Sequence, residues 1–365
     1  MSASRPGAPT LRDQIDEEAV RDIATGAAVL GGGGGGDPHR GMMATLAAVR
    51  RHGPVPLRSI DDFDDDDLIA TPALVGAPMV NLEKFPSGRE AVAGLRHLEK
   101  ISGRPIAGVF SAEIGGVNSM LPIGVAAMTG LPVVDADGIG RAVPEIDMTL
   151  FTLNGLSSTP MVMSDDYGNL VTVDSDDPRR VEAIFRPLST FFGGMAASVL
   201  LPGGGRVEVL RSALVRGAYT LAHRYGRGIR EAGGDVEKVI EVVRSVGDGR
   251  ELFRGRITDF DHEIRAGWSQ ARVTITGTGP YARSTMGIDV VNENLMAEVD
   301  GEIVSVMPDI TSVFDARSGL PITTEHVRFG FPVVVTSTPA DPRWYTPEGL
   351  DLMGPRRFGY SFAHA

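Results

Sequence analysis

Six consecutive glycines, Gly31 to Gly36, constrain this chain more than any other feature, and they lead directly into Asp37-Pro38. Glycine alone lets a backbone approach a bound group closely and adopt positive φ. Asp37 suits the N-cap of a helix, because its side-chain oxygen can accept the free N–H groups of the first turn, and Pro38 suits the first helical position. The sequence therefore predicts a loop of exposed amides that ends at a helix N-terminus.

Exposed amides and a positive helix end favour a carboxylate, a phosphate or an oxyanion. We therefore predict that the loop binds substrate; a flexible hinge or linker is the alternative. A nucleotide is not expected, because a phosphate-binding P-loop ends in Gly-Lys-Ser/Thr and this loop ends in Gly-Asp-Pro. A dinucleotide fingerprint could be threaded through any such glycine run and carries no information. The predicted substrate-binding residues of the loop are Gly33, Gly34, Gly35, Gly36 and Asp37.

The charge balance and the lack of cysteine exclude several classes of function. The chain has 47 acidic and 35 basic side chains and a net charge of -12, which argues against nucleic acid as a partner. The absence of cysteine excludes disulfides, thiolate zinc sites and a cysteine nucleophile. No apolar run approaches the roughly 18 residues of a membrane span, and the first residues lack the apolar core of a signal peptide. We expect a soluble cytoplasmic protein with no membrane partner.

Helices and strands alternate from Leu11 to about Gly130. This alternation is typical of an α/β domain with a mostly parallel sheet and flanking helices, in which sites gather at the carboxyl ends of strands. The predicted helices cover residues 11–25, 41–51, 89–101 and 120–128, and the predicted strands cover 67–75, 105–110 and 131–134.

The alternation of helices and strands ends after about Asp165, where short strands separated by Gly, Pro and Asp become frequent. A segment of linker composition, Asp174 to Pro178, marks the predicted boundary between an α/β domain (11–174) and a β-rich α+β C-terminal domain (178–363). The second half is predicted to have helices at 179–192 and 212–232, with strands at 160–163, 170–173, 256–261, 272–276, 288–291, 302–306 and 333–336.

An acidic run, Asp61-Asp62-Phe63-Asp64-Asp65-Asp66-Asp67, could suggest cation binding. Calcium loops place their ligands at alternate positions, with a glycine turn and a distal Glu, and that spacing is absent. Consecutive carboxylates more often form a solvated loop. We therefore expect a surface segment that contributes to solubility.

The segment from Glu113 to Asn118 follows a predicted strand directly and carries two glycines, Gly115 and Gly116. A Glu at a strand end projects a carboxylate over a loop with accessible amides. Glu113 is a candidate catalytic group, and Asn118 is a candidate to hold a substrate carbonyl. The structural alternative is a tight strand-to-helix turn that Asn118 only caps.

The next strand end carries Asp135, Asp137 and Arg141. Asp135 and Asp137 would share one face of an extended backbone, and two close carboxylates push their pKa values apart into a base and an acid. We predict that both are catalytic and that Arg141 binds substrate; a structural ion-pair network is the alternative. His39 could assist as a further catalytic group, and these residues could hold a divalent metal, although the sequence specifies none.

Glu83 and Lys84 are adjacent charged residues that could orient substrate or form a surface pair of little energetic value. No serine-hydrolase elbow is present. Carboxylate-assisted attack by water, with help from the amides of the glycine loop, is the chemistry that these residues allow.

These segments together resemble the S-methyl thiohydantoin desulfurase family over nearly the whole chain. One departure is a glycine at Gly32 or Gly33, where the family pattern leads us to expect a threonine. The segments that carry the resemblance are Gly26 to Asp37-Pro38, Gly76-Ala77-Pro78 with Glu83-Lys84, Glu113 to Asn118, Asp135 to Glu145, Asn292-Glu293-Asn294, Val306 to Ile310, Arg328-Phe329-Gly330 and Gly354 to Gly359.

The resemblance implies two domains, α/β and then β-rich, and hydrolysis of a methylthio-imidazolone ring to a hydantoin with release of methanethiol. We hypothesise that water attacks the ring carbon that bears the S-methyl group and that Glu113 or Asp137 removes its proton. Glycine-loop amides and Asn118 would hold the ring's carbonyl or its carboxylate side chain. Asp135 or a protonated His39 would supply the proton that lets methanethiol leave.

Two other functions stay open from the sequence. One is a cyclic amidohydrolase that opens a hydantoin or oxoproline ring, and the other is a non-catalytic partner subunit that binds small acidic ligands. We expect a homo-oligomer that acts on a small heterocyclic substrate without an obligatory cofactor, and association with hydantoinase-like or oxoprolinase-like proteins is a further expectation.

Overall fold

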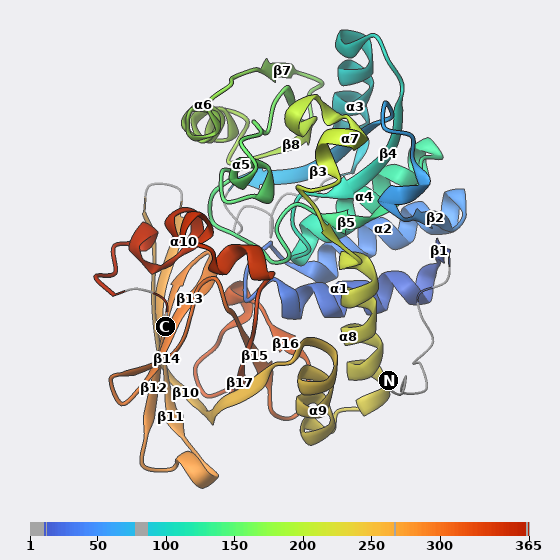
Figure 1. Ribbon diagram of the computed structural model, residues 1–365. Coiled ribbons are helices and arrows are strands. Elements are labelled where there is room, and N and C mark those ends of the chain that lie inside the picture. Colours follow the sequence, from blue (N-terminus) through green and yellow to red (C-terminus); the bar gives the residue numbers. More distant parts are fainter. Residues whose placement is uncertain (1–10, 12, 77–86, 266–267, 363, 365) are drawn as a thin grey trace, which may run out of the picture.

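The structure is a computed structural model that describes residues 11, 13–76, 87–265, 268–362 and 364. Its two halves each contain one sheet, and helix α1 (Glu17–Leu30) crosses the middle of the molecule between them (Figure 1). The fold class predicted from the sequence is confirmed: an α/β N-terminal part precedes a β-rich C-terminal part. Glu83 and Lys84 lie outside the described residues.

The first sheet has nine strands within the described residues, in the order β1-β2-β5-β4-β3-β8-β6-β7, with β9 beside β5. The central strands β2, β5, β4 and β3 are parallel, and the pairings of the other strands are antiparallel. The strands are β1 (Gln14–Ile15), β2 (Val55–Arg58), β3 (Leu68–Gly76), β4 (Ile106–Ser111), β5 (Val133–Asp137), β6 (Met161–Ser164), β7 (Leu170–Val173), β8 (Met195–Leu200) and β9 (Val215–Arg216).

Alternate side chains of the central strands enter different cores, as the pleat requires. Val109 and Val133 pack in the larger core with the long helices, whereas Phe110 and Val134 pack with the short ones on the other face. The helices of this half are α1, α2 (Pro38–His52), α3 (Arg89–Ser102), α4 (Gly116–Thr129), α5 (Leu150–Leu153), α6 (Pro178–Phe191), α7 (Val207–Leu210) and α8 (Ala218–Ala232). Helix α9 (Val236–Gly247) packs against α8 and the second sheet.

Helix α1 begins and ends later than predicted, and the expected end near Gly26 is wrong. A Cβ at Gly26 would lie 1.8 Å from the carbonyl oxygen of Ala222, and a Cβ at Gly226 would lie 1.7 Å from that of Asp22. The two glycines therefore let α1 and α8 pack backbone to backbone. Gly26 serves this helix contact, and the helix continues to Leu30.

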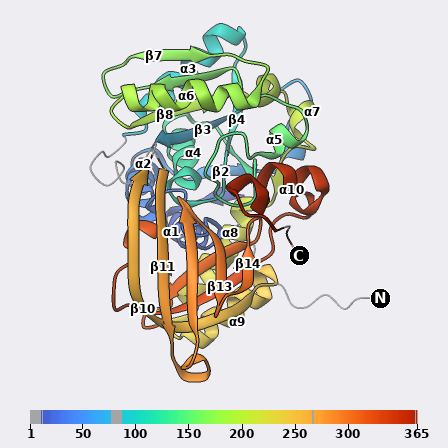
Figure 2. The same cartoon turned by 90° about the vertical axis from the view of Figure 1, so that its left-hand side faces the viewer.

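The second sheet is antiparallel, with the order β14-β13-β12-β11-β10-β17-β15-β16 among the described residues (Figure 2). Ser312 of β15 donates to the carbonyl oxygen of Val29 over 2.7 Å, which joins this sheet to the end of α1. The strands are β10 (Arg250–Arg265), β11 (Trp268–Gly277), β12 (Thr285–Val291), β13 (Glu293–Val299), β14 (Glu302–Val306), β15 (Ile310–Asp315), β16 (Pro321–Ile322) and β17 (Pro332–Thr338), and helix α10 (Pro347–Met353) follows them.

The first sheet crosses the predicted domain boundary at 174–178, because β8 and β9 follow it in sequence and still pair with β3 and β5. The domain limits 11–174 and 178–363 stay a prediction. Strands β1, β2, β8, β9, β13, β15 and β16 were not predicted, and β1 and β9 lie where the sequence predicted helix.

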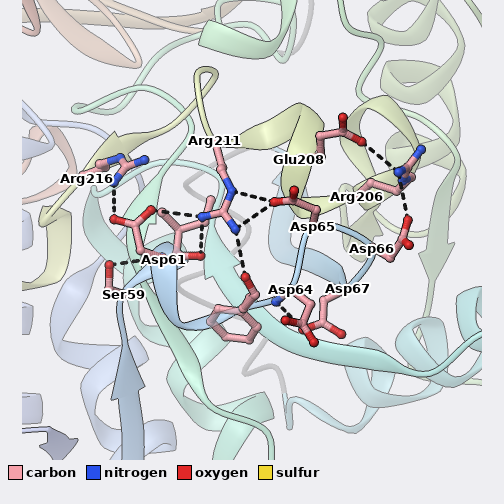
Figure 3. Close-up of polar contacts among 12 residues, drawn as sticks. Ser59, Asp61, Asp64, Asp65, Asp66, Asp67, Arg206, Glu208, Arg211 and Arg216 are labelled. Atoms are coloured by element: carbon pink, nitrogen blue, oxygen red, sulfur yellow. Dashed lines mark hydrogen bonds and ion pairs between the residues drawn. The ribbon is translucent and has the colours of Figure 1, made fainter.

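The acidic run lies at the surface as expected, but arginines from the segment between β8 and α8 bind it (Figure 3). Arg211 donates to the carboxylates of Asp61 and Asp65 and to two backbone carbonyl oxygens. Arg206 pairs with Asp66, and Arg216 also pairs with Asp61. The run therefore holds the chain that leads into α8, in addition to any effect on solubility.

Candidate functional site

The glycine loop joins two helices, since α1 ends at Leu30 and α2 begins at Pro38. Asp37 caps α2 as predicted: its Oδ1 accepts the His39 N–H over 2.9 Å. The side chain of His39 is exposed on α2. The structure therefore does not bring His39 to an enclosed site, and its predicted catalytic role stays a prediction without support from its position.

Backbone and side-chain donors from both halves of the protein bind the carbonyl oxygens of the loop. The Asn294 N–H donates to Gly32 over 2.8 Å, and the Thr324 N–H donates to Gly33 over 2.9 Å. The Val117 N–H of α4 donates to Gly35 over 2.8 Å. The loop is thus held in one position between α4 and the second sheet.

Close approach explains why the loop needs glycine. A Cβ at Gly34 would lie 2.0 Å from Oε1 of Glu293, and a Cβ at Gly35 would lie 2.5 Å from the carbonyl carbon of Gly115. Gly116 has a φ of +48°, and its Cβ would lie 2.2 Å from the Gly36 carbonyl oxygen. The β4–α4 turn and the loop therefore pack backbone against backbone, with Glu293 on the other side.

A cavity of about 130 Å³ lies at this junction. It is bounded by β3, by the β4–α4 turn, by the chain after β5, by α6 and by the short segment between β12 and β13. Gly35 and Gly36 line it, whereas Gly33, Gly34 and Asp37 are not among its lining residues. The polar lining consists of Glu113, Asn118, Glu145, Thr149, Arg186, Asn292 and Glu293, and the apolar lining includes Leu74, Val75, Val117, Ile139, Val143, Ile146, Phe185, Met195 and Leu200.

Glu113 lines the cavity and is only 8% exposed. Its Oε1 accepts from the side-chain amide of Asn118 over 2.7 Å, and its Oε2 accepts from the Val143 N–H over 3.0 Å. Burial raises the pKa of Glu113 to about 7, although these two donors and the positive charge of Arg141 oppose the rise. A carboxyl group with this pKa can take and return a proton near neutral pH.

Glu293 is a second carboxyl group of the cavity, and it was not predicted as a site residue. It is 2% exposed, and no hydrogen-bond donor or acceptor among the described residues contacts its Oε2. Asn292, with a φ of +55°, makes the single-residue turn from β12 into β13 and so directs Glu293 toward the loop. The only signal in the sequence was the segment Asn292-Glu293-Asn294 within the family resemblance.

Burial raises the pKa of Glu293 well above its ordinary value, and repulsion from Glu113 and Glu325 adds to the rise. Arg141 and a hydrogen bond with the backbone of Gly35 oppose it. Burial therefore favours the protonated form of Glu293.

Asp137 is not among the residues that line the cavity. Its Oδ2 accepts from the Ile114 N–H and from the Gly140 N–H, each over 2.8 Å. It is fully buried, and this burial raises its pKa to about 7. These bonds fix the backbone on either side of the site, so Asp137 positions Glu113, and its own catalytic role stays a prediction.

Asp135 points to a different element, the N-terminus of α8. Its Oδ1 accepts from the N–H groups of Tyr219 and Thr220, and its Oδ2 accepts from the Thr220 hydroxyl. Desolvation raises its pKa. The structure therefore separates Asp135 from the cavity, and the expected base and acid pair of Asp135 and Asp137 does not form there.

Arg141 is fully buried and joins the two halves of the protein. Its guanidinium donates to the carbonyl oxygens of Pro308 and Asp309, each over 2.7 Å, and to that of Ala142. Burial lowers its pKa to about 10, so it stays protonated at neutral pH. Arg141 is not among the residues that line the cavity, and its predicted role in binding substrate stays a prediction.

Two family models match this chain. The model of the S-Me-THD-like N-terminal domain matches residues 18–175, and that of the S-Me-THD-like C-terminal domain matches residues 175–365. The chain belongs to the S-Me-THD-like family. Its family segments meet at the site: residues 113–118 and 292–294 supply cavity side chains, and residues 306–310 supply the carbonyl oxygens that bind Arg141.

The fold is similar to that in the crystal structure of a protein from Chromobacterium violaceum, with a TM-score of 0.81 and 23% sequence identity. The match covers 96% of this chain and 99% of that one. At this identity the similarity shows the fold alone. A search of curated proteins found no match to this S-Me-THD-like chain.

Within the described residues, no group of three or more His, Asp or Glu side chains is arranged to hold a metal ion. Among the same residues, no helix has the length and apolar character needed to cross a membrane.

Proposed function

We propose that this chain is a hydrolytic desulfurase that converts an S-methyl thiohydantoin to a hydantoin and releases methanethiol. Membership of the S-Me-THD-like family supports the reaction class. The observation that carries the proposal is Glu113, a buried carboxyl group with a pKa of about 7 in the wall of a small cavity with largely apolar sides. Such a cavity suits a small heterocycle that a few polar groups orient.

In the proposed reaction, ionised Glu113 takes a proton from a water molecule as the water oxygen bonds to the ring carbon that carries the S-methyl group. Asn118 and the Val143 N–H hold the carboxylate during this step. Helix α6 contributes Phe185 and Arg186 to the cavity lining. A sulfur that carries a methyl group can leave as a thiol, whereas a thione sulfur is held by a double bond to carbon.

The other predictions of partners and location are part of this proposal. We propose a cytoplasmic homo-oligomer that acts on the heterocycle alone or beside a hydantoinase-like or oxoprolinase-like protein. Metal analysis of the purified protein tests whether the reaction requires a divalent metal.

The test incubates the purified, metal-analysed protein with an S-methyl thiohydantoin and follows thiol release and ring absorbance together. Because the chain has no cysteine, a thiol-reactive dye reports methanethiol without a protein background. Equal amounts of methanethiol and hydantoin would support the proposal. Ring opening of hydantoin or of oxoproline, offered in parallel incubations, would identify an amidohydrolase instead. No turnover of the S-methyl thiohydantoin, hydantoin or oxoproline would favour a binding subunit.

A further inference from the structure

The structure assigns to Glu293 the role of the general acid that protonates the departing sulfur, in a pair with Glu113 as the general base. This assignment rests on the proposed desulfurase function and deepens it. It replaces Asp135 and His39, the two proton donors predicted from the sequence, with a residue of the C-terminal half.

Geometry is the first argument for the pair. Glu113 and Glu293 both line the cavity of about 130 Å³, and they reach it from the β4–α4 turn and from the start of β13. By contrast, Asp135 binds the N-terminus of α8 and His39 is exposed on α2. Among the described carboxyl groups that line the cavity, the remaining one is Glu145, which forms an ion pair with Arg357.

The contacts of Glu293 are the second argument. Its side chain lies against the Cα of Gly34, where even a Cβ would overlap it, and one of its oxygens has no hydrogen-bond partner among the described residues. An unpaired buried oxygen is costly unless something binds it. A sulfur or nitrogen atom of a bound ring would provide that partner.

The charged groups that face Glu293 influence its ionisation. Glu113 and Glu325 oppose its ionisation, whereas Arg141 and the Gly35 backbone favour it. Burial adds the largest effect and raises the pKa of Glu293 well above its ordinary value, while the pKa of Glu113 rises to about 7. When Glu113 is ionised, its negative charge and the burial of Glu293 both favour the proton on Glu293.

The step balances with water as the only co-reactant. Glu113 takes the first water proton as the C–O bond forms, the electron pair of the ring C=N bond moves to nitrogen, and Glu113 passes that proton to the nitrogen. Glu113 then takes the second proton as the C=O bond forms and the C–S bond breaks. The electron pair of the C–S bond goes to sulfur, which takes the proton of Glu293. Transfer of a proton from Glu113 to Glu293 restores the starting state.

The test compares Glu293→Gln with the unmodified protein on two substrates, the S-methyl thiohydantoin and its S-trifluoroethyl analogue, whose thiol is more acidic. A weakly basic thiolate leaves without a proton, so the kcat of Glu293→Gln should fall about 10²–10⁴-fold on the S-methyl substrate and less than about tenfold on the analogue. In the unmodified protein, kcat should fall at alkaline pH as Glu293 loses its proton, and this fall should be absent from Glu293→Gln. Glu113→Gln should lose activity equally on both substrates.

Gly34→Ala provides a second variant, in which neither glutamate is replaced. Its Cβ must displace the Glu293 side chain, so it should show the same preference for the analogue as Glu293→Gln. Gly124→Ala on α4 is the matched control, because its Cβ would meet only Thr45 Oγ1 at 3.6 Å, an ordinary contact. This control should keep the activity of the unmodified protein on both substrates.

Two results would overturn the assignment. One is a Glu293→Gln variant that loses as much activity on the analogue as on the S-methyl substrate, and the other is a Glu293→Gln variant that keeps full activity on the S-methyl substrate. If the unmodified protein releases no thiol from either compound, the proposed function itself fails and the assignment fails with it.

Discussion

Asn118 links Glu113 to strand β3. Its side-chain amide donates to Glu113 Oε1 over 2.7 Å, and its side-chain oxygen accepts the Leu74 N–H over 2.7 Å. The second bond fixes which end of the amide faces the carboxyl group, so the nitrogen must point at Glu113. Asn118 therefore favours the ionised form of Glu113 and holds it at the wall of the cavity.

Asn118→Ala removes a donor from the Glu113 carboxylate. Because this donor lowers the pKa of Glu113, its loss should raise that pKa from about 7 by one to two units, which corresponds to a charged hydrogen bond of about 1.5–3 kcal/mol. The acid limb of the profile of kcat/KM against pH should move up by the same amount. An acid limb that stays in place would show that Glu113 is not the group that titrates there.

Glu113→Gln should lower kcat by about 10²–10⁴-fold and change KM little, because the amide cannot take a proton from water. Asp137→Asn is the comparison, since Asp137 does not line the cavity and an amide oxygen can still accept from Ile114 and Gly140. It should keep most of kcat. A large fall of kcat in Asp137→Asn with little change in Glu113→Gln, measured by steady-state kinetics, would identify Asp137 as the base.

The burial of Glu113 predicts a loss of stability as the pH rises. Its pKa is about 7 in the folded chain against 4.5 for an unperturbed glutamate, so its contribution is complete below pH 4.5 and is lost as the pH passes 7. The loss amounts to about 3 kcal/mol, from 1.36 kcal/mol for each pKa unit. Urea denaturation at pH 4 and pH 8 should show this difference in the free energy of unfolding, and Glu113→Gln should reduce it. An unchanged pH dependence in the variant would contradict the assigned pKa.

The sequence predicted the parts of the site that lie close together along the chain. Glu113 and Asn118 follow strand β4 within seven residues and both reach the cavity, and Asp37 caps α2 as its position implies. Asp135 and Asp137 have the same strand-end signature, yet backbone N–H groups bind both of them outside the cavity. Local spacing does not reveal which donors the fold will bring to a carboxylate.

The parts that the sequence could not predict depend on contacts between distant segments. Glu293 lies 180 residues after Glu113, and only the pairing of the loop with Asn294 and Thr324 brings it to the cavity. The glycines suggested exposed amides for a ligand, whereas at Gly34 the lack of a side chain makes room for Glu293. The first sheet likewise contains β8, whose apolar residues follow the predicted boundary.

Arg211→Ala should destabilise the protein more than Arg206→Ala, although both arginines bind the acidic run. The Arg211 side chain is 27% exposed and donates to the carbonyl oxygens of Ile60 and Phe63 as well as to carboxylates. Arg206 is 44% exposed and has only carboxylate partners in the run. We expect losses of about 1–3 kcal/mol for Arg211→Ala and about 0–1 kcal/mol for Arg206→Ala. Added salt should weaken the smaller effect more, because carbonyl contacts are not screened as ion pairs are. Equal losses in urea denaturation, both removed by salt, would mean that the run acts through its charge alone.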